Sequence, residues 1–264
     1  MDKIVITLTF DDGLDVHLDS VMPLLDRNNL KASFYVPLSA DCFHRRTNEW
    51  RQAAASGHEL GNHTIFHPAV RSKKWVREGN AIENYSLDRM RMELEVANNI
   101  LEMLDGKKER TFAFPCSYPV VGRPGLLKRT LRSLKLDRTR LMGWVDKWDL
   151  DFGSGEKNYT DVVRELFFAA RCGGLPIESL PSIPLDKYQV RGVEGDGCSA
   201  EGLLSSVDQA IERRLWLVFV FHGIGGGHRL SCSLDAFGGL VKRLASDNRI
   251  IVKTFLDAAR DIWG

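Results

Sequence analysis

The sequence lacks the features that mark several large classes of protein. No stretch approaches the ~20 consecutive apolar residues that a membrane-spanning helix needs. The net charge of +1 leaves no basic excess of the kind that binds nucleic acid. The five cysteines are scattered, without a Cys-x-x-Cys pair, which favours reduced thiols over a disulfide framework. A hydrophobic content of 44% over 264 residues is that of an ordinary globular protein.

Several catalytic motifs are missing as well. There is no Gly-x-Ser-x-Gly elbow, which argues against an α/β-hydrolase esterase, and no Gly-x-x-x-x-Gly-Lys-Ser/Thr phosphate loop. The glycine run 223–227 fails the dinucleotide pattern because His228 stands where the third glycine should be. We interpret this run as a place where backbone approaches a substrate or metal beside His222.

No signal-peptide pattern opens the chain, because Met1-Asp2-Lys3 leads directly into an apolar run. The sequence as written therefore predicts a cytoplasmic protein, and an extracytoplasmic one if a leader has been removed.

Apolar runs and helix-like periodic segments alternate along the chain. The expected strands are 4–11, 32–37, 58–63, 110–115, 215–222 and 249–254. The expected helices are 16–28, 46–56, 86–104, 160–171 and 233–246. This order predicts parallel strands with helical crossovers, in one domain that spans residues 1–264. Residues 69–84 and 173–202 interrupt it, and we expect long loops that rim a cleft or form surface insertions.

Two adjacent carboxylates end the first apolar run, in Thr9-Phe10-Asp11-Asp12-Gly13. A buried strand excludes unpaired carboxylates, so the pair indicates either a strand-ending turn or a site at the strand's C-terminal end. Because side chains alternate along a strand, Asp11 and Asp12 point in different directions and can have different roles.

A histidine-rich segment follows about fifty residues later, Gly57-His58-Glu59-Leu60-Gly61-Asn62-His63-Thr64-Ile65-Phe66-His67. His63 and His67 are spaced i, i+4, so one helical turn would place both imidazoles on one face, where they could share a divalent metal. With a carboxylate from another strand end they would form a two-histidine, one-carboxylate site. We interpret His58 as structural.

These two motifs together resemble those of the NodB-homology polysaccharide deacetylases, carbohydrate esterase family four. Segments 31–36 and 217–223 resemble the family's second strand and its final motif, in which an apolar strand ends in a histidine. The resemblance extends from residue 4 to about 255 and is strongest over residues 4–68. It implies a distorted or incomplete (β/α) barrel whose active site lies in the loops after the strands.

The resemblance also implies roles for particular residues. Asp12, His63 and His67 would hold one divalent metal, zinc first, with cobalt, manganese or iron as alternatives. Asp11 would be the general base and His222 the general acid. Cys116 with its backbone N–H, Tyr118 and Trp144 would contact the substrate or its oxyanion. Of the six tryptophans, Trp75, Trp144 and Trp148 are candidates for stacking on a sugar.

The third and fourth family motifs depart from the pattern. Ala113 stands where the family has an arginine that pairs with the catalytic aspartate, and Cys116 stands at a usually aromatic position. Arg171 or Arg191 could replace that arginine. The fourth motif falls near Trp144-Val145-Asp146-Lys147-Trp148-Asp149, where Asp146 or Asp149 would orient His222 unless this is simply an exposed acidic loop.

Three functions follow from the sequence. The first is a metal-dependent hydrolase that removes N-acetyl groups from an oligo- or polysaccharide containing N-acetylglucosamine. The second keeps the metal chemistry but acts on a small amide, a formamide or an O-acetyl ester. The third is a non-catalytic carbohydrate-binding relic, which the presence of all five catalytic and metal residues disfavours. No nucleic-acid partner is expected.

Overall fold

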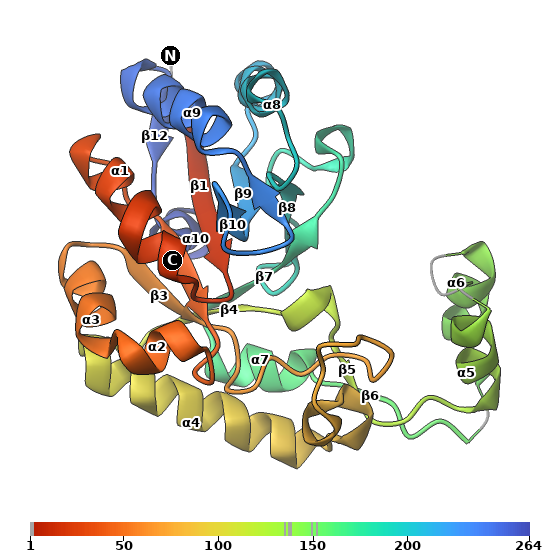
Figure 1. Cartoon of the computed structure of the whole chain (residues 1–264). Helices are drawn as coiled ribbons and strands as arrows, with labels where there is room; N and C mark the ends of the chain where they lie inside the picture. The colour runs from red at the N-terminus through yellow and green to blue at the C-terminus, as the bar shows by residue number, and fades with distance from the viewer. Residues whose placement is uncertain (1–2, 135, 137–138, 149, 152) are drawn as a thin grey trace.

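Seven parallel strands close into a barrel (Figure 1) in the computed structural model, which describes residues 3–264 except 135, 137, 138, 149 and 152. The barrel strands are β1 (Ile4–Asp11), β2 (Ser33–Val36), β3 (Glu59–Asn62), β4 (Thr111–Ala113), β7 (Ala169–Gly174), β8 (Val190–Glu194) and β9 (Leu217–Phe221). Strand β1 pairs with β2 on one side and with β9 on the other, which closes the ring. The predicted (β/α) barrel is confirmed.

The barrel is irregular in two places. Strands β3 and β4 share a single register pair, Asn62 with Phe112. The register between β7 and β8 shifts between Arg171 and Gly174. An additional strand, β12 (Ile250–Val252), pairs with the beginning of β1 outside the ring. A distorted barrel is therefore the better description.

Aromatic side chains pack the layer between the strands and their helices. The ring of Phe10 stacks on Phe34 at 5.0 Å and on Phe221 at 5.5 Å, measured between centroids, and Phe237 packs edge-on at 5.7 Å. All five residues of β9 are buried. Strands buried on both faces read as continuous apolar runs, which is why β1 and β9 are visible in the sequence.

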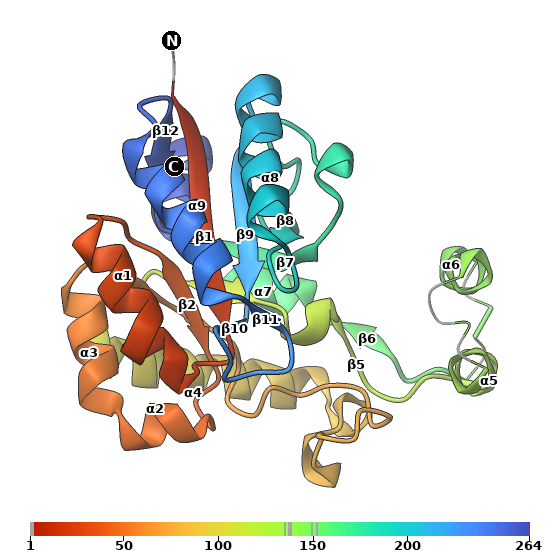
Figure 2. The same ribbon diagram turned by 45° about the horizontal axis from the view of Figure 1, so that its top comes forward.

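Helices cover the outside of the barrel and alternate with its strands (Figure 2). They are α1 (Met22–Arg27), α2 (Asp41–Arg45), α3 (Thr47–Ala55), α4 (Leu87–Asp105), α7 (Thr160–Leu166), α8 (Ala200–Arg213), α9 (Leu234–Ser246) and α10 (Phe255–Trp263). A π-helical turn, His17–Val21, leads into α1, and short 3-10 turns lie at Glu78–Asn80, Ile82–Asn84, Pro115–Ser117 and Ile177–Ser179. The predicted helix 86–104 is confirmed as α4, with Ser86 accepting the Arg89 N–H at its start and Gly106 at φ 73° beyond its end.

Two sequence predictions about the second half of the chain are wrong. The predicted helix 160–171 ends at Leu166, and the residues after it enter β7. The predicted loop 173–202 contains β8 and leads into α8. A short apolar run such as Phe167-Phe168-Ala169-Ala170 suits a buried strand as well as a helix, and no Gly or Pro marks the boundary.

A helical hairpin extends from the side of the barrel, clear of it in both views (Figures 1 and 2). Its root is the two-residue antiparallel ladder of β5 (Val120–Val121) and β6 (Lys157–Asn158). Helices α5 (Leu126–Ser133) and α6 (Arg140–Lys147) form the hairpin itself. A second small ladder, β10 (Gly223–Ile224) with β11 (Ser231–Cys232), follows β9. Among the described residues, no helix combines the length and apolarity needed to cross a membrane.

Candidate active site

Three side chains from the C-terminal ends of two strands converge on one point. Asp12 directly follows β1, His63 directly follows β3, and His67 lies further along the same loop. The Nε2 atoms of His67 and His63 lie 3.4 Å and 3.8 Å from Oδ1 of Asp12. One donor atom from each residue lies within 4.8 Å of the other two. Two imidazole nitrogens and a carboxylate fit a divalent metal ion and leave open positions for water and substrate.

His63 is oriented by a second contact, as metal-ligating histidines usually are. Its Nδ1 lies 2.7 Å from the carbonyl oxygen of Ala113, so Nδ1–H donates to that carbonyl. Burial lowers the pKa of His63 to about 4, which keeps the imidazole neutral near pH 7. The unprotonated Nε2 therefore faces Asp12 and can bind a cation.

The backbone between the two histidines is not a helical turn, so that part of the sequence prediction is wrong. Thr64 and His67 have φ values of 68° and 49°, outside the right-handed helical region. Side chains hold the loop instead: Asn62 accepts the Thr64 N–H at 2.7 Å, and Thr64 Oγ1 accepts the His67 N–H at 2.9 Å. Glu93 of α4 accepts two further loop N–H groups. The imidazoles meet through this loop geometry, with ring centroids 4.8 Å apart.

Asp11, the other carboxylate at the end of β1, forms a buried ion pair with Arg171 of β7. Arg171 lies opposite Ala113 in the register of β4 and β7. Residues paired in this way project from the same face of a sheet. The guanidinium expected at position 113 is thus supplied from the neighbouring strand, which confirms Arg171 as its replacement. Arg191, the other candidate, forms no ion pair with any described residue.

The environment of Asp11 keeps its carboxylate ionised. Burial by itself would raise the pKa of Asp11, but the positive charge of Arg171, with smaller contributions from His63 and His222, lowers the pKa to about 2. Asp11 and Asp12 therefore differ as the sequence predicts, one facing Arg171 and the other facing the histidines.

His222 lies at the end of β9 and is held by Asp196, a residue that the sequence prediction missed. Oδ2 of Asp196 lies 2.5 Å from Nδ1 of His222, and its Oδ1 accepts the His222 N–H at 3.0 Å. The buried His17 donates from Nε2 to the carbonyl oxygen of His222 at 2.8 Å. Burial would lower the pKa of His222, but the hydrogen bond to Asp196 and the charges of Asp11 and Asp12 raise it to about 9.

Asp196 takes the role proposed for Asp146 or Asp149. Asp149 and the side chain of Asp146 lie outside the described residues. The signal for Asp196 is a strand that ends in Glu194-Gly195-Asp196-Gly197, again a carboxylate in a glycine turn after an apolar run. The interpretation of residues 173–202 as one long loop hides this signal.

His228 is a second residue that the sequence prediction did not place in the site. Its ring stacks on His222 with centroids 5.2 Å apart, and its Nε2 lies 3.9 Å from Oδ2 of Asp12. Glycines 225, 226 and 227 all have positive φ, a conformation that lets the loop fold back over the barrel. Nδ1 of His228 contacts the backbone of Leu230, 3.2 Å from its N–H and 3.3 Å from its carbonyl oxygen, while Nε2 faces the site.

The three predicted substrate contacts have different outcomes. Cys116 follows β4 in a left-handed conformation, φ 51°, and desolvation raises its thiol pKa, aided by Asp12 and Asp11, which disfavours a nucleophilic thiolate. The hydroxyl of Tyr118 bonds to Glu156 at 3.2 Å and to Arg132, in the root of the hairpin. Trp144 is exposed on α6, which lies apart from the barrel (Figure 1). The structure therefore separates Trp144 from the metal ligands.

Trp75 lies next to the metal ligands. It belongs to the loop 69–84 that the sequence predicts at the rim of a cleft, and its ring centroid lies 5.3 Å from that of His67. The side chain is half exposed, so one face remains accessible. Aromatic faces at such positions suit the apolar face of a sugar ring.

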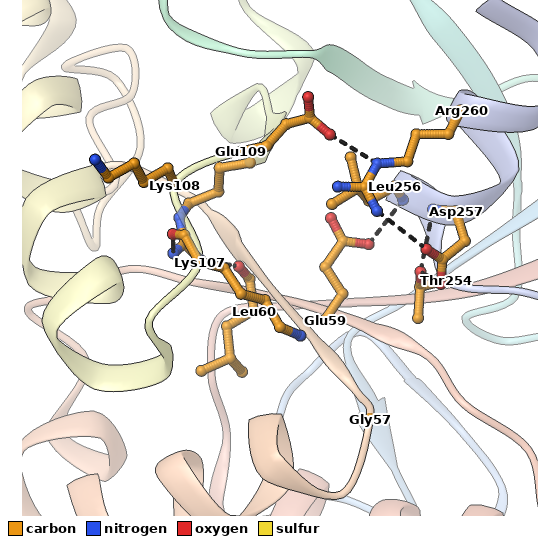
Figure 3. Close-up of a pocket in the computed structure, with 11 residues that line it drawn as sticks. Gly57, Glu59, Leu60, Lys107, Lys108, Glu109, Thr254, Leu256, Asp257 and Arg260 are labelled. Carbon is orange, nitrogen blue, oxygen red and sulfur yellow. Dashed lines mark hydrogen bonds and ion pairs between the residues drawn. The ribbon is translucent and has the colours of Figure 1, made fainter. Parts of the chain in front are cut away.

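A separate pocket of about 300 Å³ opens at the opposite end of the barrel, where β3 and β4 begin (Figure 3). The buried carboxylate of Glu59 accepts hydrogen bonds there from Ser33, Thr111 and the backbone of Leu256. Arg260 pairs with Glu109 at 2.7 Å across the mouth (Figure 3). These contacts connect α10 to the barrel, and we interpret the pocket as structural.

Comparison with known proteins finds a family resemblance in the N-terminal part of the chain. The chain forms a (β/α) barrel with a three-donor candidate metal centre. The family model described as polysaccharide deacetylase matches residues 1–120. This match confirms the resemblance to the NodB-type polysaccharide deacetylases.

Two curated relatives match over part of their length. A peptidoglycan-N-acetylglucosamine deacetylase from Bacillus cereus is 35% identical over 68 residues, 25% of this chain and 24% of that protein. A gellan lyase from a Bacillus species is 29% identical over 111 residues, 41% of this chain and 4% of that protein. The matches thus span no more than about a quarter of either relative.

Solved structures of carbohydrate esterase family four share the fold over nearly the whole chain. A family 4 acetyl xylan esterase from Clostridium thermocellum, in complex with a cobalt ion, has a TM-score of 0.55 at 17% identity, covering 98% of this chain and 91% of that one. A family four pseudoenzyme from Bacillus anthracis has a TM-score of 0.53 at 14% identity, covering 97% and 66%. Because active and inactive proteins share this fold, function depends on the site.

Proposed function

We propose that this protein is a metal-dependent hydrolase that removes N-acetyl groups from oligo- or polysaccharides containing N-acetylglucosamine. One observation carries the proposal. The three convergent metal ligands lie between a buried carboxylate held by an arginine and a histidine held by an aspartate. A non-catalytic relic would not need both supporting pairs. A divalent ion at Asp12, His63 and His67 supplies Lewis-acid activation of water and of the acetyl carbonyl.

The chain's own residues divide the proton transfers between them. Asp11, ionised at working pH, accepts the proton of the attacking water. His222, whose raised pKa keeps it protonated near pH 7, donates a proton to the departing amine. The imidazole of His228 and the backbone N–H of Cys116 lie next to the site and are available to the developing oxyanion.

The substrate class rests on one feature of the rim. The exposed face of Trp75 beside His67 offers a platform for a sugar ring next to the reacting acetyl group. The test is acetate release from a panel of N-acetylated oligosaccharides, O-acetylated sugars and small amides, each assayed after chelation and with zinc, cobalt or manganese restored. Turnover confined to O-acetyl esters or small amides would show that these are the substrates instead. Absence of turnover on every compound in the panel would favour a non-catalytic carbohydrate-binding protein.

We expect His222→Ala to separate amide from ester chemistry. An amine must be protonated as it leaves, whereas an activated phenolic leaving group needs no proton. Turnover on N-acetylated substrate should therefore fall by roughly 10²-fold or more, and turnover on an aryl acetate by much less. Steady-state kinetics on both substrates measure the difference. Equal losses would show that His222 positions the substrate or stabilises the oxyanion.

We also expect Asp196→Asn to change the pH profile. In the wild type, activity should fall as pH rises through about 9, because the His222 imidazolium then loses its proton. Removing the Asp196 charge lowers that pKa, so the alkaline limb should move to lower pH by roughly one unit or more. Asp161→Asn, on the exposed surface of α7, is the matched control. An unchanged alkaline limb in Asp196→Asn would contradict the assignment of His222 as the acid.

A further inference from the structure

Polar contacts hold the two ends of the helical hairpin of residues 123–156 together, and Tyr118 and the β5–β6 ladder join it to the rest of the protein. The carboxylate of Asp151 accepts the N–H groups of Gly125 and Lys128 at 2.6 and 3.0 Å, which caps the start of α5. At the root, Glu156 pairs with Arg132 at 2.9 Å and accepts the hydroxyl of Tyr118. These contacts tie the start and the end of the hairpin together at its root.

The two helices bury only part of their apolar surface against each other. Their common core is formed by Leu131 of α5 with Met142 and Val145 of α6, and Leu136 packs beside it. A second apolar stripe faces solvent: Leu141 and Trp144 of α6 and Trp148, which follows α6 directly, are 51%, 65% and 60% exposed. The Trp148 N–H donates to the Trp144 carbonyl at 3.0 Å, which continues the helical path. On a helix with 100° per residue these three positions fall within about 60° of one another, so they form one continuous stripe. Large aromatic side chains grouped in this way mark an interaction surface.

Positive charge borders this stripe. The same helical geometry places Arg140 and Lys147 together, within about 60° of Trp144 and on the side away from the hairpin core. Both are exposed, and neither forms an ion pair with a residue that the structure describes. Residues 123–156 carry eight Lys and Arg against five Asp and Glu, a net +3, although the whole chain carries only +1. The hairpin therefore concentrates positive charge, since the other 230 residues together carry a net −2.

We propose that the α5–α6 hairpin docks the protein on an anionic lipid surface through the Leu141–Trp144–Trp148 stripe. Tryptophan is favoured at the level of lipid headgroups, where its ring is apolar and its N–H remains hydrated. Arg140 and Lys147 reach the anionic headgroups beside it, an attraction that salt weakens. This combination of Trp and Leu on one face with Lys and Arg next to it is that of an interfacial helix that lies on a bilayer without crossing it.

The test is co-sedimentation of the full chain with vesicles of phosphatidylcholine alone and with about one third phosphatidylglycerol added. We expect binding to the anionic vesicles that weakens as salt is raised. The double variant Trp144→Ser/Trp148→Ser should bind roughly tenfold or more weakly, and Arg140→Gln/Lys147→Gln should lose the preference for anionic vesicles. Met103→Ser, a 76% exposed apolar residue on α4, is the matched control and should bind like wild type. Thermal melting checks that each variant is folded.

Three results would overturn the proposal. The first is that the wild-type protein does not sediment with anionic vesicles, or that the Trp144→Ser/Trp148→Ser variant sediments with them as strongly as wild type does. The second is a particle of twice the 29.8 kDa chain mass that becomes monomeric in the Trp double variant, with no lipid binding, which would assign the stripe to a second copy. The third is that the protein binds insoluble chitin through Trp144 and Trp148 but does not bind vesicles, which would assign the stripe to a glycan.

Discussion

Replacing His63 with alanine is expected to abolish stoichiometric metal binding and nearly all turnover. His63 is buried and held in the ligating orientation by Ala113, so its loss removes one of the three convergent donors. The remaining Asp12 and His67 form a two-donor site, too few for tight binding of a catalytic metal. Because a metal contributes several kcal/mol of transition-state stabilisation, turnover should fall by roughly 10³-fold or more.

The measurement is metal content by mass spectrometry after equilibration with limiting zinc, together with acetate release from the same sample. His44→Ala is the matched control, because His44 is exposed on α2 and takes no part in the site. It should retain both metal and activity. Full metal occupancy in His63→Ala would remove His63 from the ligand set.

Replacing Arg171 with methionine is expected to destabilise the fold as well as reduce activity. Methionine keeps much of the volume but leaves the buried Asp11 without its counter-ion. Breaking a buried ion pair from one side typically costs about 3–5 kcal/mol in the free energy of unfolding. Urea denaturation measures that loss, and kinetics should show a lower kcat because Asp11 would be partly protonated and less well positioned.

The sheet register offers a rescue experiment for this pair. Ala113 lies opposite Arg171, so an arginine at position 113 can reach toward Asp11 from the neighbouring strand. The double variant Ala113→Arg/Arg171→Met should regain part of the lost stability and turnover. Wild-type stability and kcat in the single variant would show that the Asp11–Arg171 pair has no role in the fold or the reaction.

The same pair predicts how stability depends on pH. The pKa of Asp11 is lowered in the folded protein to about 2, below its value in the unfolded chain. Its contribution is therefore fully present above the unfolded pKa of roughly 4 and is lost as pH falls toward 2. In Arg171→Met this acid-dependent loss should become smaller.

The sequence was sufficient for the parts of the site that are encoded locally. Asp11 and Asp12 end an apolar run, and His63 and His67 lie close together in one segment, so their residue types and spacing identify them directly. The strands that carry them are buried on both faces and stand out as continuous apolar runs. His222 could be found for the same reason.

The supporting residues depend on which strands become neighbours in the barrel, and this is why they were harder to predict. Arg171 was one of two candidates, and only the pairing of β7 with β4 brings it opposite Ala113. Asp196 and His222 are 26 residues apart and meet because β8 and β9 are adjacent. His228 reaches the site through a glycine loop whose path follows from backbone conformation, which apolar periodicity does not reveal.

The measurement that tests the account most directly is a metal titration of the chelated protein, with bound metal and acetate release from an N-acetylglucosamine oligosaccharide followed in the same sample. We predict no turnover without metal, and activity that rises in proportion to bound ion and reaches its plateau at one ion per chain. Full turnover in the metal-free protein would contradict the account, as would absence of turnover on every acetylated substrate when one ion is bound.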